Sequence, residues 1–260
     1  MNKLLPLFFL LLSVSSVHAF AKDGCGAGSC IDCHKLTVQE AGVLLKGVDK
    51  VHRVEPAEVP GLWLVDAEKD KQRFPVYIDF SKSYLIAGNV IRLRDNQNIT
   101  AEQQARSNPV DVSRIPLGDA LLLGSAKAKK KVIVFTDPEC PYCKRLHHEL
   151  QEVVRRDPDI AFWIKLYPLK MHPNAYNTSK SIVCTKSMAM LESSFEGKAV
   201  PPPLCETRAI DENIALAAEL GINSTPTLIL PDGVIAPGYK KADDLLRLLG
   251  SRPAKAAPQR

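Results

Sequence analysis

The segment Cys140-Pro141-Tyr142-Cys143 places two cysteines two residues apart, a spacing at which they can form a disulfide with each other. An apolar run typical of a buried strand, residues 131–135, comes shortly before it, and a pattern typical of a helix follows. At the first turn of a helix, unpaired backbone N–H groups and the helix dipole stabilise an anion, which favours a thiolate at Cys140. Pro141 suits the first helical position, because its missing N–H group costs nothing there.

The thiol pKa at such a position falls to roughly 3.5–7.5, from about 8.5 for a free cysteine. Glu139 is adjacent and opposes a thiolate, so we do not expect an extreme value. Cys143 lies one turn into the helix and should be the more buried, resolving thiol. We expect His147, one further turn along, to be a surface residue, and a catalytic role near the thiols is the alternative.

Zinc binding and a purely structural disulfide are the alternatives for such a pair of cysteines. Zinc would need a second pair of ligands, and no Cys or His pair with zinc-finger spacing lies nearby in the sequence. A structural disulfide seldom occupies a strand-to-helix turn with proline at the first helical position. The pattern therefore predicts redox catalysis by thiol–disulfide exchange.

Thr225-Pro226 supports this prediction from a distant part of the chain. It follows Gly221 and precedes an apolar strand, where a trans proline would disrupt the start of the strand. A cis peptide bond would instead place Thr225 beside the sulfur of Cys140, with its backbone N–H and C=O groups available to an extended substrate chain. The alternative is an ordinary trans proline in a turn.

The first residues resemble a secretory signal peptide. Lys3 is followed by an apolar run, residues 4–14, and by small residues that allow cleavage after Ala19 or Ala21. This run is too short to span a bilayer, and no later stretch approaches eighteen apolar residues. We therefore expect an exported protein in an oxidising compartment, in which the 7 cysteines can form disulfides.

Cys30-Ile31-Asp32-Cys33-His34 matches the covalent attachment motif of c-type haem, in which His34 would bind the iron. No cytochrome-like sequence surrounds the motif, and His52 is only a weak candidate for a second iron ligand. The other uses are a disulfide or free thiols among these cysteines and Cys25, or a zinc site made of three cysteines and His34. A Soret band would distinguish haem from the rest.

The predicted elements fall into two groups. In the first, a short helix over 38–45 begins at Thr37, and apolar runs indicate an antiparallel meander at residues 62–65, 74–78, 84–86 and 90–93. A polar segment with a helix over 101–106 follows. The second group has the order β-α-β, helices, β-β-α, with strands at residues 131–135, 160–167, 227–230 and 234–236, and helices over 146–154, within 172–209, over 210–220 and over 242–249.

The composition excludes few other functions. The formal charge of +5 is mildly basic, and 45% hydrophobic residues suffice for a core in each group of elements. The clustered lysines at 127 and 129–131 have no aromatic residues between them, so we interpret them as a solvated loop and expect no binding of nucleic acid.

This order of elements is that of a thioredoxin fold with a helical insertion, and the motifs along it resemble the DsbC/DsbG family of periplasmic disulfide isomerases. The resemblance covers residues 60–249, and the motifs that carry it are Phe135-Thr136-Asp137, Cys140-Pro141-Tyr142-Cys143, the pair Cys184 and Cys205, and the segment 221–227. The Pro-Tyr dipeptide is similar to DsbG, whereas the second cysteine pair is similar to DsbC.

The resemblance implies an α/β, thioredoxin-like catalytic domain behind a small α+β dimerisation domain. It implies that Cys140 is the nucleophile, Cys143 the resolving thiol and Pro226 a cis-proline, and that Cys184 and Cys205 form a structural disulfide. It further implies a homodimer, misfolded or reduced exported proteins as substrates, and a DsbD-type membrane reductase as electron donor. The expected division is a signal peptide 1–19, a cysteine-containing arm 22–59, a dimerisation domain 60–100, a linker 101–125, a catalytic domain 126–250 and a disordered tail 251–260.

The expected function is isomerisation or reduction of incorrect disulfides in the periplasm, which requires no cofactor. Three alternatives are left open by the sequence. A net dithiol oxidase would have the same fold, a haem or redox carrier would serve cytochrome maturation, and a chaperone would hold unfolded chains without using Cys140.

Overall fold

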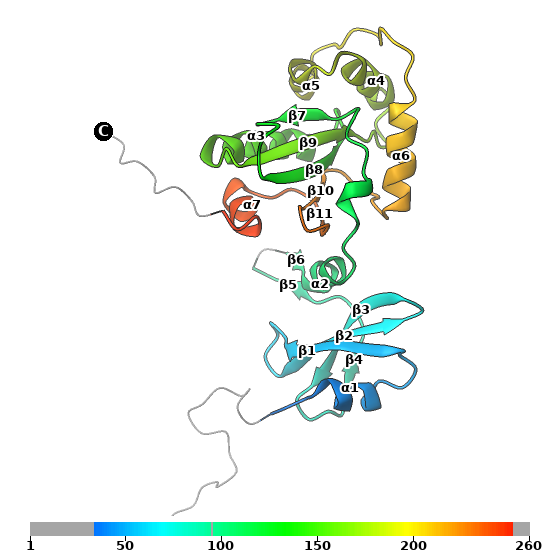
Figure 1. The fold of residues 1–260 in the computed structure, drawn as a ribbon, viewed down its shortest axis with the longest axis vertical. Coiled ribbons are helices and arrows are strands. Elements are labelled where there is room, and N and C mark those ends of the chain that lie inside the picture. The colour runs from blue at the N-terminus through cyan, green and yellow to red at the C-terminus, as the bar shows by residue number, and fades with distance from the viewer. Residues whose placement is uncertain (1–33, 95, 252–260) are drawn as a thin grey trace, which may run out of the picture.

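The computed structural model describes residues 34–94 and 96–251, which form two sheet-based units joined by a short helical segment (Figure 1). The first unit is a four-stranded antiparallel sheet with the order β1-β2-β3-β4. Its elements are α1 (Val38–Leu44), β1 (Lys50–Pro56), β2 (Leu62–Lys69), β3 (Gln72–Asp79) and β4 (Leu85–Ile86).

Helix α1 begins where the sequence predicts, because Thr37 and Glu40 form a capping box. The Thr37 hydroxyl accepts a hydrogen bond from the Glu40 backbone N–H at 3.2 Å, and the Glu40 carboxylate accepts one from the Thr37 N–H at 2.8 Å. Ala41 on this helix is buried against the apolar side chains of β1 and β2. The segment 36–56 therefore contributes Leu36, Ala41, Leu45 and Val51 to the core of the first sheet and is not the separate arm that the sequence suggested.

Two strand predictions in this unit are wrong. Strand β1 was not predicted, because Val51 is its one buried residue and charged side chains occupy much of the strand. Conversely, residues 90–93 do not extend the meander. They contribute β5 (Ile91–Arg92), which pairs with β6 (Gln97–Asn98) in a separate hairpin.

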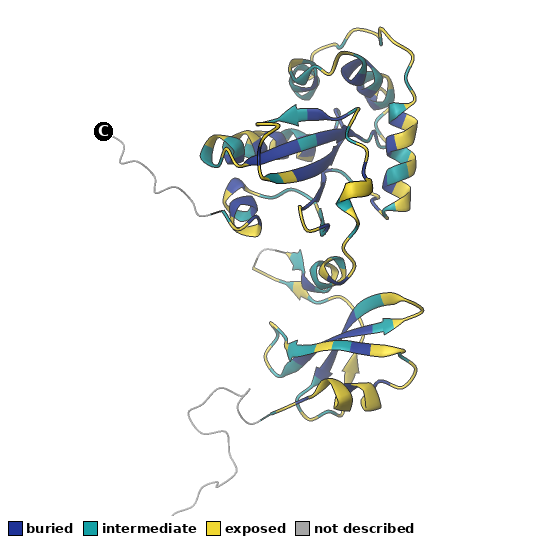
Figure 2. Cartoon of the chain, in the orientation of Figure 1, coloured by how far each residue is buried: buried dark blue, intermediate teal, exposed yellow. Residues whose placement is uncertain are grey.

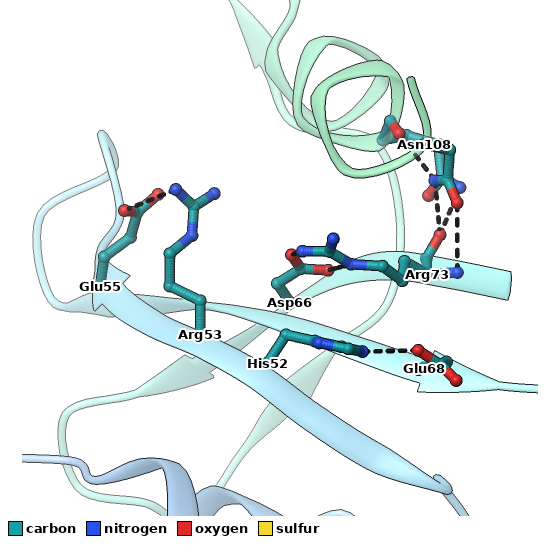
Figure 3. Close-up of polar contacts among 8 residues, drawn as sticks. His52, Arg53, Glu55, Asp66, Glu68, Arg73 and Asn108 are labelled. Atoms are coloured by element: carbon teal, nitrogen blue, oxygen red, sulfur yellow. Dashed lines mark hydrogen bonds and ion pairs between the residues drawn. The ribbon is translucent and has the colours of Figure 1, made fainter. Parts of the chain in front are cut away.

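Helix α2 (Ile99–Ser107) packs on β3 and is not a free linker. Asn108, at its C-terminal end, accepts a hydrogen bond from the Arg73 backbone N–H at 3.3 Å and donates to the Arg73 carbonyl oxygen at 2.9 Å (Figure 3). The Arg73 guanidinium also pairs with buried Asp66 on β2. Side-chain and backbone contacts thus fasten α2 to the first sheet.

The second unit is a five-stranded sheet with the order β11-β10-β8-β9-β7, in which β8 and β9 are parallel and the other pairs antiparallel. Its strands are β7 (Leu121–Leu123), β8 (Lys130–Thr136), β9 (Ile160–Leu166), β10 (Thr227–Ile229) and β11 (Ile235–Pro237). Its helices are α3 (Pro141–Arg156), α4 (Ala175–Thr185), α5 (Met188–Phe195), α6 (Ala209–Glu219) and α7 (Ala242–Leu248). A 3₁₀ turn, Val112–Arg114, precedes β7.

Strand β8 is covered on both faces, which explains its continuous apolar sequence (Figure 2). Val132 and Val134 pack into the larger cluster with side chains of α3 and α7, whereas Ile133 and Phe135 pack on the opposite face with residues that include Ala217 of α6. Strand β7 was expected to be part of a linker, but it forms an edge of this sheet beside β9.

Gly233 marks a close approach between the segment after α2 and the turn that joins β10 to β11. The Val110 N–H donates to the Gly233 carbonyl oxygen at 2.9 Å. Gly233 has φ +84°, and a Cβ atom there would lie 2.1 Å from the Val110 carbonyl oxygen. Only glycine fits this position without a shift of the backbone. In the described part of the chain, no helix is long and apolar enough to cross a membrane.

Candidate active site

Cys140 is the N-cap residue of α3, directly after the buried strand β8, and Pro141 occupies the first helical turn. The side chain of Cys140 is largely enclosed, with 5% of the residue exposed. The Cys140 sulfur lies 3.6 Å from the carbonyl oxygen of Thr225, and the Thr225–Pro226 peptide bond is cis. Antiparallel pairing of β10 with β8 sets Thr227 opposite Phe135, which carries Thr225 to the start of α3.

Local hydrogen bonds lower the pKa of Cys140 to about 5. The largest cause is the hydrogen bond from the Cys143 thiol, and the backbone N–H groups of Cys143 and Tyr142 add to it, against the opposing effect of burial. The value lies within the range predicted for a cysteine at the start of a helix, despite the neighbouring Glu139.

Cys143 is 1% exposed, and burial raises its thiol pKa far above that of a free cysteine. Its sulfur accepts a hydrogen bond from the Asp137 backbone N–H at 3.4 Å. The two cysteines are not joined by a disulfide in this structure. The two sulfurs therefore differ in the way that a nucleophile and a resolving thiol require, since one ionises near pH 5 and the other stays protonated.

A buried ion pair, not anticipated from the sequence, lies beside these thiols. The Asp137 carboxylate is fully buried and accepts hydrogen bonds from His172 Nδ1 at 2.8 Å, the Leu169 N–H at 2.7 Å and the Glu139 N–H at 2.8 Å. The pKa of His172 is raised, and the main cause is the hydrogen bond between His172 and Asp137. His172 is 35 positions away from Asp137, so no pattern of neighbouring residues in the sequence indicates this pair.

His147 is buried, contrary to the expected surface position. Helix α5 covers this side of α3, so that His147 Nε2 lies 3.0 Å from the Glu192 carboxylate and the imidazole packs near the Phe195 ring. Burial lowers the pKa of His147. The helical insertion was predicted, but its contact with this face of α3 was not.

A cleft of about 900 Å³ opens beside Cys140, between the start of α3 and the helical insertion. Its polar lining side chains are Glu139, Lys144, Asn174, Asn177, Thr178, Ser181, Ser194 and Lys198. A disulfide joins Cys184 at the end of α4 to Cys205, beyond the segment 197–203 that forms one wall. The cleft is thus lined in part by Cys140 itself.

Of the haem-attachment motif, Cys30 and Cys33 lie outside the described residues, as does Cys25. His34 stacks on Phe80 with 5.0 Å between the ring centroids. His52 Nε2 lies 2.5 Å from the Glu68 carboxylate on β2, an ion-pairing contact (Figure 3).

Comparison with known families decides the classification. Residues 118–252, more than half of the chain, match the family described as a thioredoxin-like domain. The chain belongs to this thioredoxin-like family. The expected thioredoxin-like fold class, with antiparallel strands in the N-terminal region, is confirmed.

Curated relatives of this thioredoxin-like protein are thiol:disulfide interchange proteins. The probable DsbC of Bordetella avium is 28% identical over 163 residues, which are 62% of this chain and 57% of the relative. DsbC of Salmonella typhimurium is 30% identical over 132 residues, 50% of this chain and 54% of the relative. The chain thus spans little more than half the length of these relatives, and the resemblance to DsbC is confirmed over that part.

Among solved structures, the crystal structure of a disulfide interchange protein from Neisseria gonorrhoeae aligns with a TM-score of 0.45 and 28% identity. The alignment covers 53% of this chain and 100% of the other.

Proposed function

We propose that this protein catalyses thiol–disulfide exchange in the periplasm, isomerising or reducing incorrect disulfides of exported proteins. The observation that carries the proposal is the sulfur of Cys140, whose pKa is lowered to about 5 and which lies at the mouth of a cleft beside the Thr225 carbonyl. A thiolate at neutral pH is the nucleophile that such exchange requires. The DsbC names of the relatives agree with this chemistry.

The first step forms a mixed disulfide. The Cys140 thiolate attacks one sulfur of the substrate disulfide, that bond breaks, and the departing substrate sulfur takes up a proton from solvent. In isomerisation, a different substrate thiolate then attacks the mixed disulfide and releases Cys140 as a thiolate. The enzyme returns unchanged.

Reduction of the substrate uses Cys143 instead. Cys143 loses its proton and attacks the Cys140 sulfur, which releases the reduced substrate and leaves a Cys140–Cys143 disulfide. Two electrons must then be supplied, and a DsbD-type membrane reductase is the proposed donor. No cofactor takes part in either route.

Net oxidation of substrate dithiols is the second candidate, and the low pKa of Cys140 favours it specifically. A stabilised Cys140 thiolate stabilises the reduced form of the enzyme, so the Cys140–Cys143 disulfide is a stronger oxidant. Reactivation of scrambled ribonuclease, compared with oxidation of reduced ribonuclease, separates the two functions. The proposal predicts that the wild type reactivates scrambled ribonuclease and that Cys140→Ala does not. A wild type without this activity, together with a Cys140→Ala variant that has it, would refute the proposal.

We also propose a homodimer that forms through the edge strand β4. Tyr84, Leu85 and Ile86 are 71%, 56% and 42% exposed. In the described residues β4 pairs only with β3, so its other edge is available to a second chain. Exposed apolar residues on an edge strand commonly mark a site of association.

The haem-attachment motif does not enter this mechanism. Covalent haem at Cys30 and Cys33 remains a prediction, and a Soret band in protein produced together with haem-attachment enzymes would support it. A spectrum without that band would leave a disulfide, free thiols or a metal site for these residues.

A further inference from the structure

The Asp137 carboxylate poses an electrostatic problem for the exchange reaction. It is fully buried, its own backbone N–H contacts the Cys143 sulfur at 3.4 Å, and its oxygen binds the N–H of Glu139, the residue before Cys140. A negative charge in this position repels a thiolate, because the surrounding protein screens charges poorly. Left alone, Asp137 would raise the pKa of Cys140.

His172 is placed to offset that charge. Its Nδ1 atom lies 2.8 Å from the Asp137 carboxylate, and one fifth of its side chain is exposed, which gives the imidazole access to protons from solvent. The charged groups that face it are Asp137 and Glu139, from the segment after β8, and the thiolate of Cys140 on α3. All three are negative and therefore favour the imidazolium form.

We propose that protonated His172 neutralises Asp137 and thereby keeps Cys140 acidic, so that His172 is a positioning residue for the exchange reaction. The inference deepens the proposed function and rests on it. Asp137 still holds the loop through its bonds to Leu169 and Glu139, but as half of a neutral pair. The raised pKa of His172 agrees with this arrangement, since each negative neighbour stabilises the cation.

The first test measures Cys140 acidity directly, without a protein substrate. Iodoacetamide alkylation of Cys140 in the reduced chain, located by peptide mass spectrometry, is followed together with thiolate absorbance from about pH 3.5 to 8, which spans the range of thiol pKa values at helix starts. With His172→Gln, the Cys140 titration should move to higher pH, and the alkylation rate at pH 5 should fall about five-fold, as expected from the loss of one nearby opposite charge. His172→Lys restores a cation and should restore the wild-type titration.

His148→Gln is the matched control. His148 is an exposed histidine on α3, and no hydrogen bond or ion pair joins it to another of the described residues. This variant should titrate like the wild type. A His172→Gln curve that coincides with wild type, or a His172→Lys curve that coincides with His172→Gln, would overturn the proposal.

The second test asks whether His172 acts through Asp137. Adding Asp137→Asn to His172→Gln removes the unpaired carboxylate and should return the Cys140 titration toward wild type. If His172→Gln shifted the titration equally with and without Asp137→Asn, action through the carboxylate would be refuted.

A third measurement leaves the sequence unaltered, in case Asp137→Asn disturbs folding. Coupling between two sites is reciprocal, so the Cys140 thiolate must raise the pKa of His172. An NMR titration of the His172 imidazole should give a lower pKa in the oxidised protein, which lacks the thiolate, than in the reduced protein. Identical His172 pKa values in the oxidised and reduced protein would contradict the role proposed for His172, whether or not the protein is active as an isomerase. Thiol–disulfide exchange without these pKa shifts would refute that role but leave the proposed function intact.

Discussion

The sulfur of Cys140 lies 3.6 Å from the backbone carbonyl oxygen of Thr225, a residue 85 positions later in the chain. The contact exists because β10 pairs with β8, so that the segment before one strand meets the helix that follows the other. A substrate sulfur that bonds to Cys140 must therefore pass beside an extended backbone segment, whose polar groups are available for pairing.

The asymmetry between the two thiols predicts the behaviour of a trapped intermediate. Cys143→Ser should accumulate a mixed disulfide with substrate, because Cys140 still attacks but no resolving thiol follows. Non-reducing electrophoresis with scrambled ribonuclease measures this species. Cys140→Ser should form none, and an adduct of similar yield in both variants would show that another cysteine reacts.

The pH dependence of alkylation should follow the lowered pKa of Cys140. In the reduced wild type, the rate should be half-maximal near pH 5. In Cys140→Ala, Cys143 should react negligibly below about pH 8, because it is buried and its pKa is raised. Peptide mass spectrometry identifies the modified residue, and substantial labelling of Cys143 at neutral pH would contradict the assignment.

The same shift makes the stability of the reduced protein depend on pH. The folded-state pKa of Cys140 is about 5, below an unfolded value of about 8.5. The unfolded chain therefore binds more protons between these values, and stability rises with pH across this interval and falls as pH drops toward 5. Urea unfolding at about pH 5 and about pH 8 should show this slope in the wild type and a smaller one in Cys140→Ala.

The ion pair between Lys165 and Asp119 should contribute to the free energy of unfolding independently of the thiols. Lys165 on β9 is fully buried, pairs with Asp119, and donates to the Pro116 carbonyl oxygen at 2.7 Å. Lys165→Met leaves Asp119 without its counter-charge and should cost about 3–5 kcal/mol of unfolding free energy. Denaturant unfolding of Lys165→Met combined with Asp119→Asn should recover much of this loss, because the unpaired charge is gone.

The Cys184–Cys205 disulfide should contribute to stability but not to the exchange chemistry. It closes a loop with a sequence separation of 21, for which loop-closure entropy corresponds to about 3 kcal/mol. Replacing both cysteines by serine should lower the unfolding free energy by about this amount while the alkylation rate of Cys140 is unchanged. A parallel loss of Cys140 reactivity would indicate that the disulfide also shapes the reactive site.

The edge strand β4 predicts the oligomeric state. Leu85→Arg combined with Ile86→Arg should convert the proposed dimer to a monomer, measured by analytical ultracentrifugation. Val43→Arg, at a residue of α1 that is 76% exposed, is the control and should leave the dimer intact. A monomeric wild type would refute the proposed association.

The chain itself determined much of the second unit, because its signals are local. A strand buried on both faces is apolar throughout, and Pro141 suits only the start of a helix, so the placement of Cys140 between β8 and α3 could be predicted from adjacent residues. The same holds for α1, whose capping box lies within four neighbouring positions.

Only the tertiary structure decided which distant groups surround the thiols. The pairing of His172 with Asp137 and the covering of His147 by α5 depend on how the helical insertion folds back toward α3, and no short-range pattern encodes that path. Strand β1 escaped prediction for a related reason: its partner β2, and not its own polar sequence, makes it a strand. Local propensity places a reactive cysteine, but the long-range packing around it sets its charge environment.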